Sequence, residues 1–284
     1  MLFNIAPRTQ DIGFPVKRLL PSKLKQRVGP FIFVDHMGPA LFKGGTTEGD
    51  VRQHPHIGLA TVTYLFSGAM MHKDSLGFQQ RIEPGAINLM TAGSGIVHSE
   101  RMPEDVRQQT VSVEGVQIWL ALPTENETGE PSFVHYPAAA IPELHLSLMK
   151  VRVLIGSALG AQSPVQTLSP TTYLDLQMEA GAVYIPEFPG HELAIYIAAG
   201  NLSINGEPIP EFHLCVLEPG DKIEALSAAR ALLLGGEPLS GERFILWNFV
   251  ASSREQVRAA SQRWEEGDFA LVEGETEFIP LPKM

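Results

Sequence analysis

The sequence predicts an all-β protein that contains two copies of one β domain and a single helix near its C-terminal end. Three observations support this fold class: short runs rich in β-branched and aromatic residues, turn signals such as EPG and NGEP between them, and an internal repeat at a spacing of about 130 residues. Many short strands joined by turns are typical of a β-sandwich or a β-barrel.

Five segments have the composition of strands, because each is rich in Val, Ile, Leu, Thr or Tyr and is bounded by turn residues. They are residues 60–70, 115–122, 150–157, 172–178 and 193–200.

One helix is predicted over residues 253–267. Ser253 is followed three residues later by Gln256, which is a capping-box pattern, and Gly267 is a suitable stop. We expect the helix to pack on the sheets through an apolar face. The residues that share this face are Val257, Ala260 and Trp264.

Residues of the first half of the chain recur in the second half. Aligning Tyr64 with Tyr196 also places Gly68 on Gly200, because each glycine follows its tyrosine at the same distance. Two related runs at a fixed spacing predict a duplicated β domain.

The EPG motif extends the predicted repeat, because it pairs Gly85 with Gly220 at nearly the same offset. We expect an N-terminal domain at 1–125 and a C-terminal domain, including the helix, at 134–284. The segment 123–133 is polar and rich in turn residues, and it is the predicted linker.

The composition fits an ordinary globular protein. Of the 284 residues, 44% are apolar and 19% are charged, so a sizeable core can form and general disorder is not indicated. The net charge of −11 argues against direct nucleic-acid binding, because an acidic chain is not attracted to phosphates.

Cysteine usage and apolar runs predict a cytoplasmic protein. Cys215 is the one cysteine, so no disulfide can form within the chain, and its apolar surroundings favour a buried structural role. No secretory signal is recognised, and no apolar run approaches the roughly 18 residues that a membrane span requires.

The motif HPHIG, residues 54–58, raises the question of a metal site. His54 and His56 point to the same face if the segment is a strand, and Pro55 favours extended backbone there. Alone, two alternating histidines are weak evidence, because strand histidines are commonly just exposed.

A second pair of candidate ligands follows in residues 91–100, where His98 and Glu100 also alternate. On adjacent strands the two pairs would supply three imidazoles and one carboxylate, which suit a first-row divalent metal. Four protein ligands would complete the coordination of zinc, typical of a structural role, whereas six-coordinate iron would keep room for water, dioxygen or a substrate oxygen.

The second copy lacks these ligands at the matching positions. Counting back eight residues from the repeated tyrosine gives His56 in the first copy and Phe188 in the second. Counting on from the glycine of each EPG motif by one shared distance gives His98 in the first copy and Leu233 in the second. We therefore expect one metal per chain, in the N-terminal half.

Other polar residues are candidates for the surroundings of the site. His72, in HKDSLG together with Asp74, is a candidate for the pocket mouth, with a polar hairpin loop as the alternative. Asp35 and His36 are candidates for a hydrogen bond to a ligand imidazole, with a turn-stabilising Asp as the alternative.

These motifs resemble the pirin family over roughly residues 5–120. The resemblance is carried by GPFIFVDHMGP, HPHIGLATVTYL, HKDSLG and PGAINLMTAGSGIVHSE. Pirins are bicupins, so the resemblance implies two cupin barrels (double-stranded β-helices, or jelly rolls) in one chain, with the C-terminal helix added.

The family implies a mononuclear iron site in the first cupin. Its ligands carry over to His54, His56, His98 and Glu100. One divalent metal is therefore expected, with Fe(II) favoured and Ni, Cu, Mn, Co or Zn as alternatives. Ser94 stands where several pirins have arginine, which would alter the charge at the pocket.

Two functions follow from the resemblance. The first is a dioxygenase that opens a flavonol such as quercetin at the 2,3 bond with dioxygen and releases carbon monoxide, with Glu100 as catalytic base. The alternative is an iron-dependent regulatory protein that binds a transcription factor or a metabolic enzyme. Other cupin chemistry, such as sugar isomerisation, remains a third alternative.

The partners expected from these functions are a flavonol-like aromatic substrate and dioxygen, or a protein for the regulatory alternative. No membrane partner is expected. A monomer is favoured because a bicupin already pairs two barrels within one chain.

Overall fold

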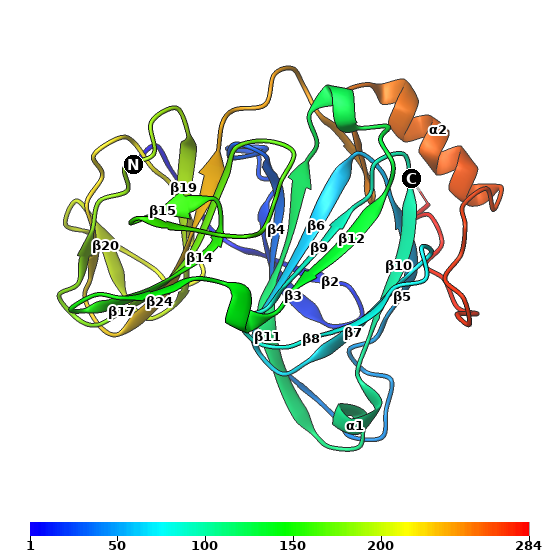
Figure 1. The fold of residues 1–284 in the computed structure, drawn as a ribbon, viewed down its shortest axis with the longest axis horizontal. Coiled ribbons are helices and arrows are strands. Elements are labelled where there is room, and N and C mark those ends of the chain that lie inside the picture. The colour runs from blue at the N-terminus through cyan, green and yellow to red at the C-terminus, as the bar shows by residue number, and fades with distance from the viewer. Residues whose placement is uncertain (284) are drawn as a thin grey trace. The chain divides into compact units, whose positions relative to one another are not determined.

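The computed structural model describes residues 1–283, and it confirms an all-β fold with one long helix near the C-terminal end (Figure 1). Contacts divide the chain into two compact units, each assembled from three segments. The N-terminal barrel unit consists of residues 10–16, 37–138 and 240–283, and the C-terminal barrel unit consists of residues 1–9, 17–36 and 139–239. Strands β2, β3 and β4 contribute residues to both units.

The first barrel contains a larger and a smaller sheet. The larger sheet has the strand order β12-β9-β6-β11-β4-β3-β2. In that order the bounds are Ser132–Tyr136, Ile87–Thr91, Leu59–Ser67, Val111–Ala121, Phe31–Phe42, Pro15–Leu20 and Arg8–Asp11. The smaller sheet has the order β5-β10-β7-β8. Its bounds are Val51–His56, Ile96–Arg101, Met70–Asp74 and Gln79–Ile82.

The second barrel repeats this plan strand by strand. Its larger sheet has the order β1-β22-β19-β24-β17-β14-β13. The bounds are Phe3–Ile5, Leu214–Val216, Glu192–Ala199, Ala229–Gly236, Thr171–Met178, Met149–Ile155 and Glu143–His145. The smaller sheet has the order β18-β23-β20-β21, with bounds Val183–Tyr184, Ile223–Ala225, Leu202–Ile204 and Glu207–Ile209.

The remaining elements are short hairpins and helices. They are β15 (Ser157–Ala158), β16 (Ala161–Gln162), β25 (Phe244–Leu246), β26 (Phe249–Ala251), α1 (Glu104–Arg107), α2 (Arg254–Glu265) and the 3-10 turns η1 (Thr124–Asn126) and η2 (Ala138–Ala140). Among the described residues, none of the helices is both long enough and apolar enough to cross a membrane.

The five segments predicted as strands are confirmed as β6, β11, β14, β17 and β19. The repeated glycines end two of them for the same reason. Gly68 and Gly200 both have φ of 80°. A Cβ atom would lie 2.9 Å from the Ser112 carbonyl oxygen at Gly68 and 2.2 Å from that of Ala228 at Gly200. Only glycine fits either position, which supports the predicted repeat.

The predicted pairing of Gly85 with Gly220 is wrong. Gly85 lies between β8 and β9, whereas Gly220 lies between β22 and β23, a different step of the shared topology. Both EPG motifs form the same local turn, in which the residue after the glycine donates to the glutamate carbonyl at 3.2 and 3.1 Å. Such turns recur anywhere between strands and carry no information on register. Leu233, which this pairing matched with His98, lies on β24, the counterpart of β11 rather than of β10.

Strand register identifies the true counterpart of Glu100. The offset that aligns Tyr64 with Tyr196 also places Ile204 of β20 at the position of His72 in β7. Glu100 pairs with His72 across the first small sheet. Ile223 pairs with Ile204 across the second. An isoleucine therefore stands in the second barrel where the first has a buried carboxylate.

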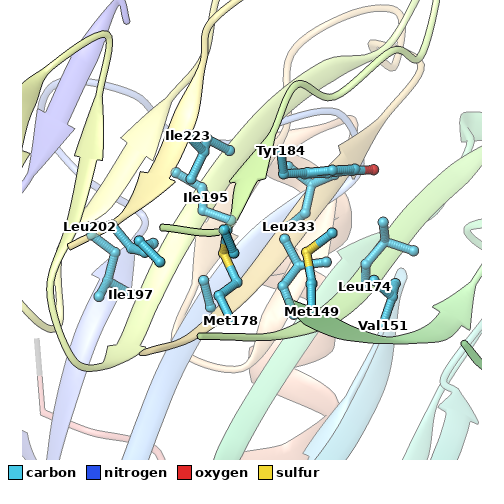
Figure 2. Packing of buried hydrophobic residues seen from close by; sticks show 14 of the residues in the cluster. Met149, Val151, Leu174, Met178, Tyr184, Ile195, Ile197, Leu202, Ile223 and Leu233 are labelled. Carbon is cyan, nitrogen blue, oxygen red and sulfur yellow. The ribbon is translucent and has the colours of Figure 1, made fainter. Parts of the chain in front are cut away.

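A large cluster of buried apolar side chains forms the core of the second barrel (Figure 2). Tyr184, Ile195, Ile223 and Leu233 pack there with Met149, Val151, Leu174 and Met178, and Figure 2 shows these side chains close together. Cys215 belongs to the same cluster, which confirms a buried place for it. Burial raises the pKa of its thiol to about 12, so it is unreactive at neutral pH.

Helix α2 is confirmed, with Ser253 Oγ accepting a hydrogen bond from the Gln256 amide at 3.2 Å. Its apolar face packs on Ile57 and Val97, so it belongs to the N-terminal barrel unit. The predicted domain limits, with a linker at 123–133, stay a prediction, and they differ from these compact units in the place of the helix.

Candidate metal centre

The two predicted ligand pairs meet on neighbouring strands. β5 and β10 are antiparallel, with His98 opposite His54 and Ile96 opposite His56. Alternation along each strand turns all three imidazoles to the inner face, while Val97 points to the other face, under α2. The three histidines are at most 7% exposed. The sequence spacing therefore predicted this convergence correctly.

The three imidazoles are close enough to share one metal ion. One nitrogen from each of His54, His56 and His98 lies within 4.8 Å of the other two. The Nε2 atoms of His56 and His98 are 3.0 Å apart. Two nitrogens bound to one metal at about 2.1 Å and about a right angle are separated by about 3 Å, so this spacing fits.

Backbone carbonyls set the orientation of two of the rings. His54 Nδ1 is 2.8 Å from the Arg52 carbonyl oxygen, and His56 Nδ1 is 3.1 Å from that of Asn248. A carbonyl only accepts, so Nδ1 carries the proton in both rings. The lone pair of each ring therefore sits on Nε2, the atom that faces the cluster.

A hydrogen-bond relay from Asp74 through His72 orients the third ring, that of His98. Asp74 Oδ2 accepts from His72 Nε2 at 2.8 Å, so His72 Nδ1 is an acceptor. It lies 3.4 Å from His98 Nδ1, which donates to it. The lone pair of His98 is thereby left on Nε2. A histidine whose far nitrogen is held through a carboxylate in this way is typical of metal sites.

Asp74, at the far end of this relay, is also held in place. Asp74 Oδ1 accepts from the amides of Leu76 and Phe78, at 3.0 and 3.1 Å. The His72 ring stacks on Phe133 at 4.3 Å. His72 was a candidate for the pocket mouth, with a polar hairpin loop as the alternative, and the structure places it on β7 beside His98, 5% exposed.

Burial keeps the three histidines in the neutral form that binds metals. It lowers the pKa of His54 to about 4. The pKa values of His56 and His98 lie well below the usual value for the same first reason, with the neighbouring imidazoles adding to the effect. All three are therefore free of a second proton at neutral pH, and no proton must be displaced from them by a metal.

Glu100 lies next to this cluster but outside the group of converging nitrogens. Its Oε1 is 3.5 Å from His98 Nδ1, and the side chain is buried. The register between β10 and β5 shifts between His98 and Glu100, which places Glu100 opposite Val51. Burial raises the pKa of Glu100 to about 8, so the carboxyl holds its proton far more firmly than an exposed glutamate does.

Asp35 and His36 make their hydrogen bonds elsewhere. The carboxylate of Asp35 is paired with Arg18, at 2.8 and 2.7 Å, and His36 Nδ1 is 2.7 Å from the Tyr196 hydroxyl. Both residues belong to the C-terminal barrel unit. The hydrogen bonds to ligand imidazoles for which they were candidates come instead from backbone carbonyls and His72.

A guanidinium does lie beside Ser94, although residue 94 is not an arginine. Arg263 of α2 donates from Nη1 to the Ser94 carbonyl oxygen at 3.2 Å, and its guanidinium stacks on Phe269. Arg263 is also paired with Asp268, at 3.4 Å, which offsets its charge.

Sequence reasoning missed the contribution of the turn at 247–248. Trp247 has φ of 54°, unusual for a residue with a side chain, and the next carbonyl is the one that holds His56. The Trp119 ring also contacts His56, at 5.1 Å. No sequence signal marks a carbonyl as a partner, whereas Trp119 could have been found from its place on a predicted strand.

The chain is similar to known proteins in both sequence and structure. The family models described as Pirin and as Pirin C-terminal cupin domain match residues 13–120 and 173–270. A pirin-like protein of Caulobacter vibrioides is 45% identical, over 97% of each chain, and human pirin is 31% identical, over 89% of this chain and 87% of its own. A quercetin 2,3-dioxygenase of Acinetobacter baumannii has a similar crystal structure, with a TM-score of 0.91, 34% identity and coverage of 99% of this chain and 95% of that one.

Proposed function

This chain belongs to the pirin family, and from that premise we propose that it is a metal-dependent dioxygenase that cleaves a flavonol such as quercetin. The observation that carries the proposal is the buried cluster of His54, His56 and His98, whose Nε2 atoms are left free by partners at Nδ1. The similar structure from Acinetobacter baumannii is named for the same activity.

The proposed metal ligands are the three imidazoles and the carboxylate of Glu100. Neutral imidazoles with one carboxylate suit Fe(II), our proposed metal, and also suit Ni, Cu, Mn or Co. When bound, such a metal would act as a Lewis acid on the oxygens of the flavonol. Glu100 would enter the ligand set by turning from His98 Nδ1, which it approaches to 3.5 Å.

Glu100 is also the proposed general base. The reaction requires loss of the proton from the flavonol 3-hydroxyl before dioxygen can attack the electron-rich ring. With a pKa of about 8 the metal-free side chain holds its proton at neutral pH. A cation bound beside it would favour the carboxylate, and a buried carboxylate accepts a proton more readily than an exposed one. Glu100 is 9% exposed, so it would hold this proton away from bulk water.

The remaining residues hold the site in place. Asp74 and His72 fix the ring of His98, and the turn at Asn248 fixes that of His56. The buried rings of Trp119 and Phe133 pack against His56 and His72 and add to their support.

The test is one titration with two readouts. Metal-free protein is loaded with Fe(II), Ni(II), Cu(II) or Mn(II) in turn, and metal per chain and oxygen uptake with quercetin are measured. We expect about one metal per chain, with uptake abolished in Glu100→Ala and both metal and uptake lost in His98→Ala. His145→Ala is the matched control, because that histidine is exposed and bonded only to Glu143.

Each outcome decides between functions. If the protein binds one metal per chain and none of the four metals supports oxygen uptake, the dioxygenase is refuted and the regulatory alternative is favoured. Normal metal binding in His98→Ala would refute the proposed ligand set.

A further inference from the structure

The C-terminal barrel unit contains a cavity of about 900 Å³ that no part of the proposed reaction uses. Its floor includes Ala158 and Tyr184, which belong to the apolar core, and its wall includes Phe188 and His191. Leu168, 51% exposed, stands at the rim. Cavities of this volume, lined mostly by apolar and aromatic groups with a few polar ones, are typical of small-molecule sites.

One residue of the cavity lining stands at a position that holds the metal cluster in the other barrel. Phe188 lies eight residues before Tyr196, as His56 lies eight residues before Tyr64. At the counterpart of Glu100, Ile223 replaces the carboxylate of the first barrel, and Figure 2 shows this residue in the apolar core with Tyr184. The second barrel has thus lost the donor atoms for a metal but has kept a hollow lined with rings.

Tyr184 supplies a polar group in this hollow. The residue is 8% exposed, and its hydroxyl makes no hydrogen bond to any described residue. Burial, with the nearby Glu187, raises the pKa of Tyr184 to about 12, so the hydroxyl is a donor at neutral pH. The hydroxyl oxygen is not among the fully buried polar atoms that lack a partner, so it reaches the open space of the cavity, where a bound ligand with an acceptor would receive its hydrogen bond.

His191 supplies a second polar group and part of an aromatic wall. Its ring lies 6.1 Å from that of Phe188 with an angle of 23° between the planes, so the two form a flat stacked pair. His191 Nδ1 is 3.0 Å from Thr172 Oγ1, and Nε2 has no partner among the described residues. A flat ring pair with one free nitrogen matches a planar ligand that carries a hydroxyl.

The charge of the lining narrows the ligand class. Glu187 is among the described residues that line the cavity, and these include no lysine or arginine. An anion would therefore meet a carboxylate and no cation, which disfavours its binding. We propose that this cavity is a metal-independent binding site for a neutral planar aromatic alcohol, a ligand of the phenol class, held against Phe188 and His191 and hydrogen-bonded to Tyr184.

The test uses 2-naphthol as the probe and the full, metal-free chain. Equilibrium dialysis should give about one bound molecule per chain, with 2-naphthoate binding at least about tenfold more weakly because of its charge. Phe188→Ala should weaken 2-naphthol binding about tenfold. Tyr184→Phe, which keeps the ring in the core, should weaken it about 3- to 10-fold through loss of the hydrogen bond.

Two controls separate this site from the metal centre and from misfolding. Leu226→Ala alters a side chain of the same unit that is 50% exposed and outside the cavity, and it should bind as the parent does. His56→Ala removes a metal ligand and should also leave 2-naphthol binding unchanged. The proposal is overturned if 2-naphthol does not bind, if Tyr184→Phe and Phe188→Ala bind normally, or if His56→Ala abolishes binding. None of these results depends on dioxygenase activity.

Discussion

At the scale of single residues, hydrogen bonds to Nδ1 decide what the candidate metal centre can do. The residue types and their alternation were predictable, because a strand has a period of two and Pro55 favours extended backbone. The hydrogen-bond partners of the imidazoles were less predictable. The Asn248 carbonyl lies 192 residues from His56, and every residue type presents the same carbonyl, so nothing in the sequence marks it.

Asp74→Asn should weaken metal binding without disturbing the turn. Asparagine keeps the Oδ1 that accepts from Leu76 and Phe78, but its amide group cannot accept the proton of His72 Nε2. His72 would then orient His98 poorly. We expect about a 10-fold loss of affinity for Fe(II) or Ni(II), measured by competition with a chelator. Asp105→Asn, at an exposed carboxylate, is the control, and equal affinity in both variants would contradict the relay.

Glu100 gives the metal-free protein an unusual pH dependence. Its pKa in the folded state, about 8, is above the usual glutamate value of 4.5, so between these values the folded state binds more protons than the unfolded state. The contribution of Glu100 to stability is therefore complete below about pH 4.5 and is lost as the pH rises to 8. We expect a loss of the order of 3–5 kcal/mol in the free energy of unfolding.

Glu100→Gln is the reference for this prediction, because glutamine does not titrate. His54 changes in the opposite sense: its pKa of about 4 is lowered, so its contribution is present above pH 6.5 and is lost as the pH falls toward 4. The parent and Glu100→Gln share this contribution of His54, so it cancels when their free energies of unfolding are subtracted. Urea unfolding at pH 5 to 8 should show the parent losing stability relative to Glu100→Gln as the pH rises. If the free energies of unfolding of the two proteins change with pH in parallel, the predicted effect of Glu100 is disproved.

At the scale of elements, local patterns predicted what forms but not what it packs against. The cap at Ser253 and the apolar face of α2 were readable, since both depend on residues within one helix. The partners of that face, Ile57 and Val97, lie in the other half of the chain. The EPG turns misled for the same reason, because a turn motif is local and strand register is not.

One buried ion pair ties these distant elements together. Glu127 Oε1 is 3.0 Å from Arg243 Nε, and both side chains are at most 2% exposed. Glu127 Oε2 also accepts from the amide and the hydroxyl of Ser252, at 3.0 and 2.7 Å. The segment after β11 is thereby joined to the hairpin β25–β26, whose turn holds His56.

Glu127→Ala should cost about 3–5 kcal/mol in the free energy of unfolding, because Arg243 would keep a buried charge without its partner. Metal affinity should fall as well, since the turn at Asn248 would lose its support. Glu125→Ala, two residues away and exposed, should change stability by less than about 0.5 kcal/mol. Similar unfolding midpoints in denaturant for the two variants would rule out this role of the pair.

At the scale of the whole molecule, one topology carries two kinds of core. Both barrels have the same strand order, and the same glycine ends the same strand in each. The first buries three imidazoles and a carboxylate, and the second has a buried isoleucine at the counterpart of Glu100 and a half-buried phenylalanine at that of His56. Buried polar groups cost stability, so the first barrel keeps them at the expense of its own core, as functional sites commonly do.

Reciprocal exchange at the counterpart positions tests this account. Ile223→Glu places a carboxyl in an apolar core that offers no partner, and we expect it to destabilise the protein by about 3 kcal/mol or more. Glu100→Ile removes a buried carboxyl, and the metal-free variant should be at least as stable as its parent. Val183→Glu, at a position 46% exposed, is the control and should be near neutral.

Urea unfolding of the metal-free proteins at pH 7 measures all three changes. A stable Ile223→Glu variant would mean that the second barrel tolerates a buried carboxyl as the first does, and the two cores would not differ in the way proposed. A marked loss of stability in Glu100→Ile would mean that Glu100 supports the folded first barrel through its shape and contacts. Its presence would then need no functional explanation, and the case for a base at this position would rest on activity alone.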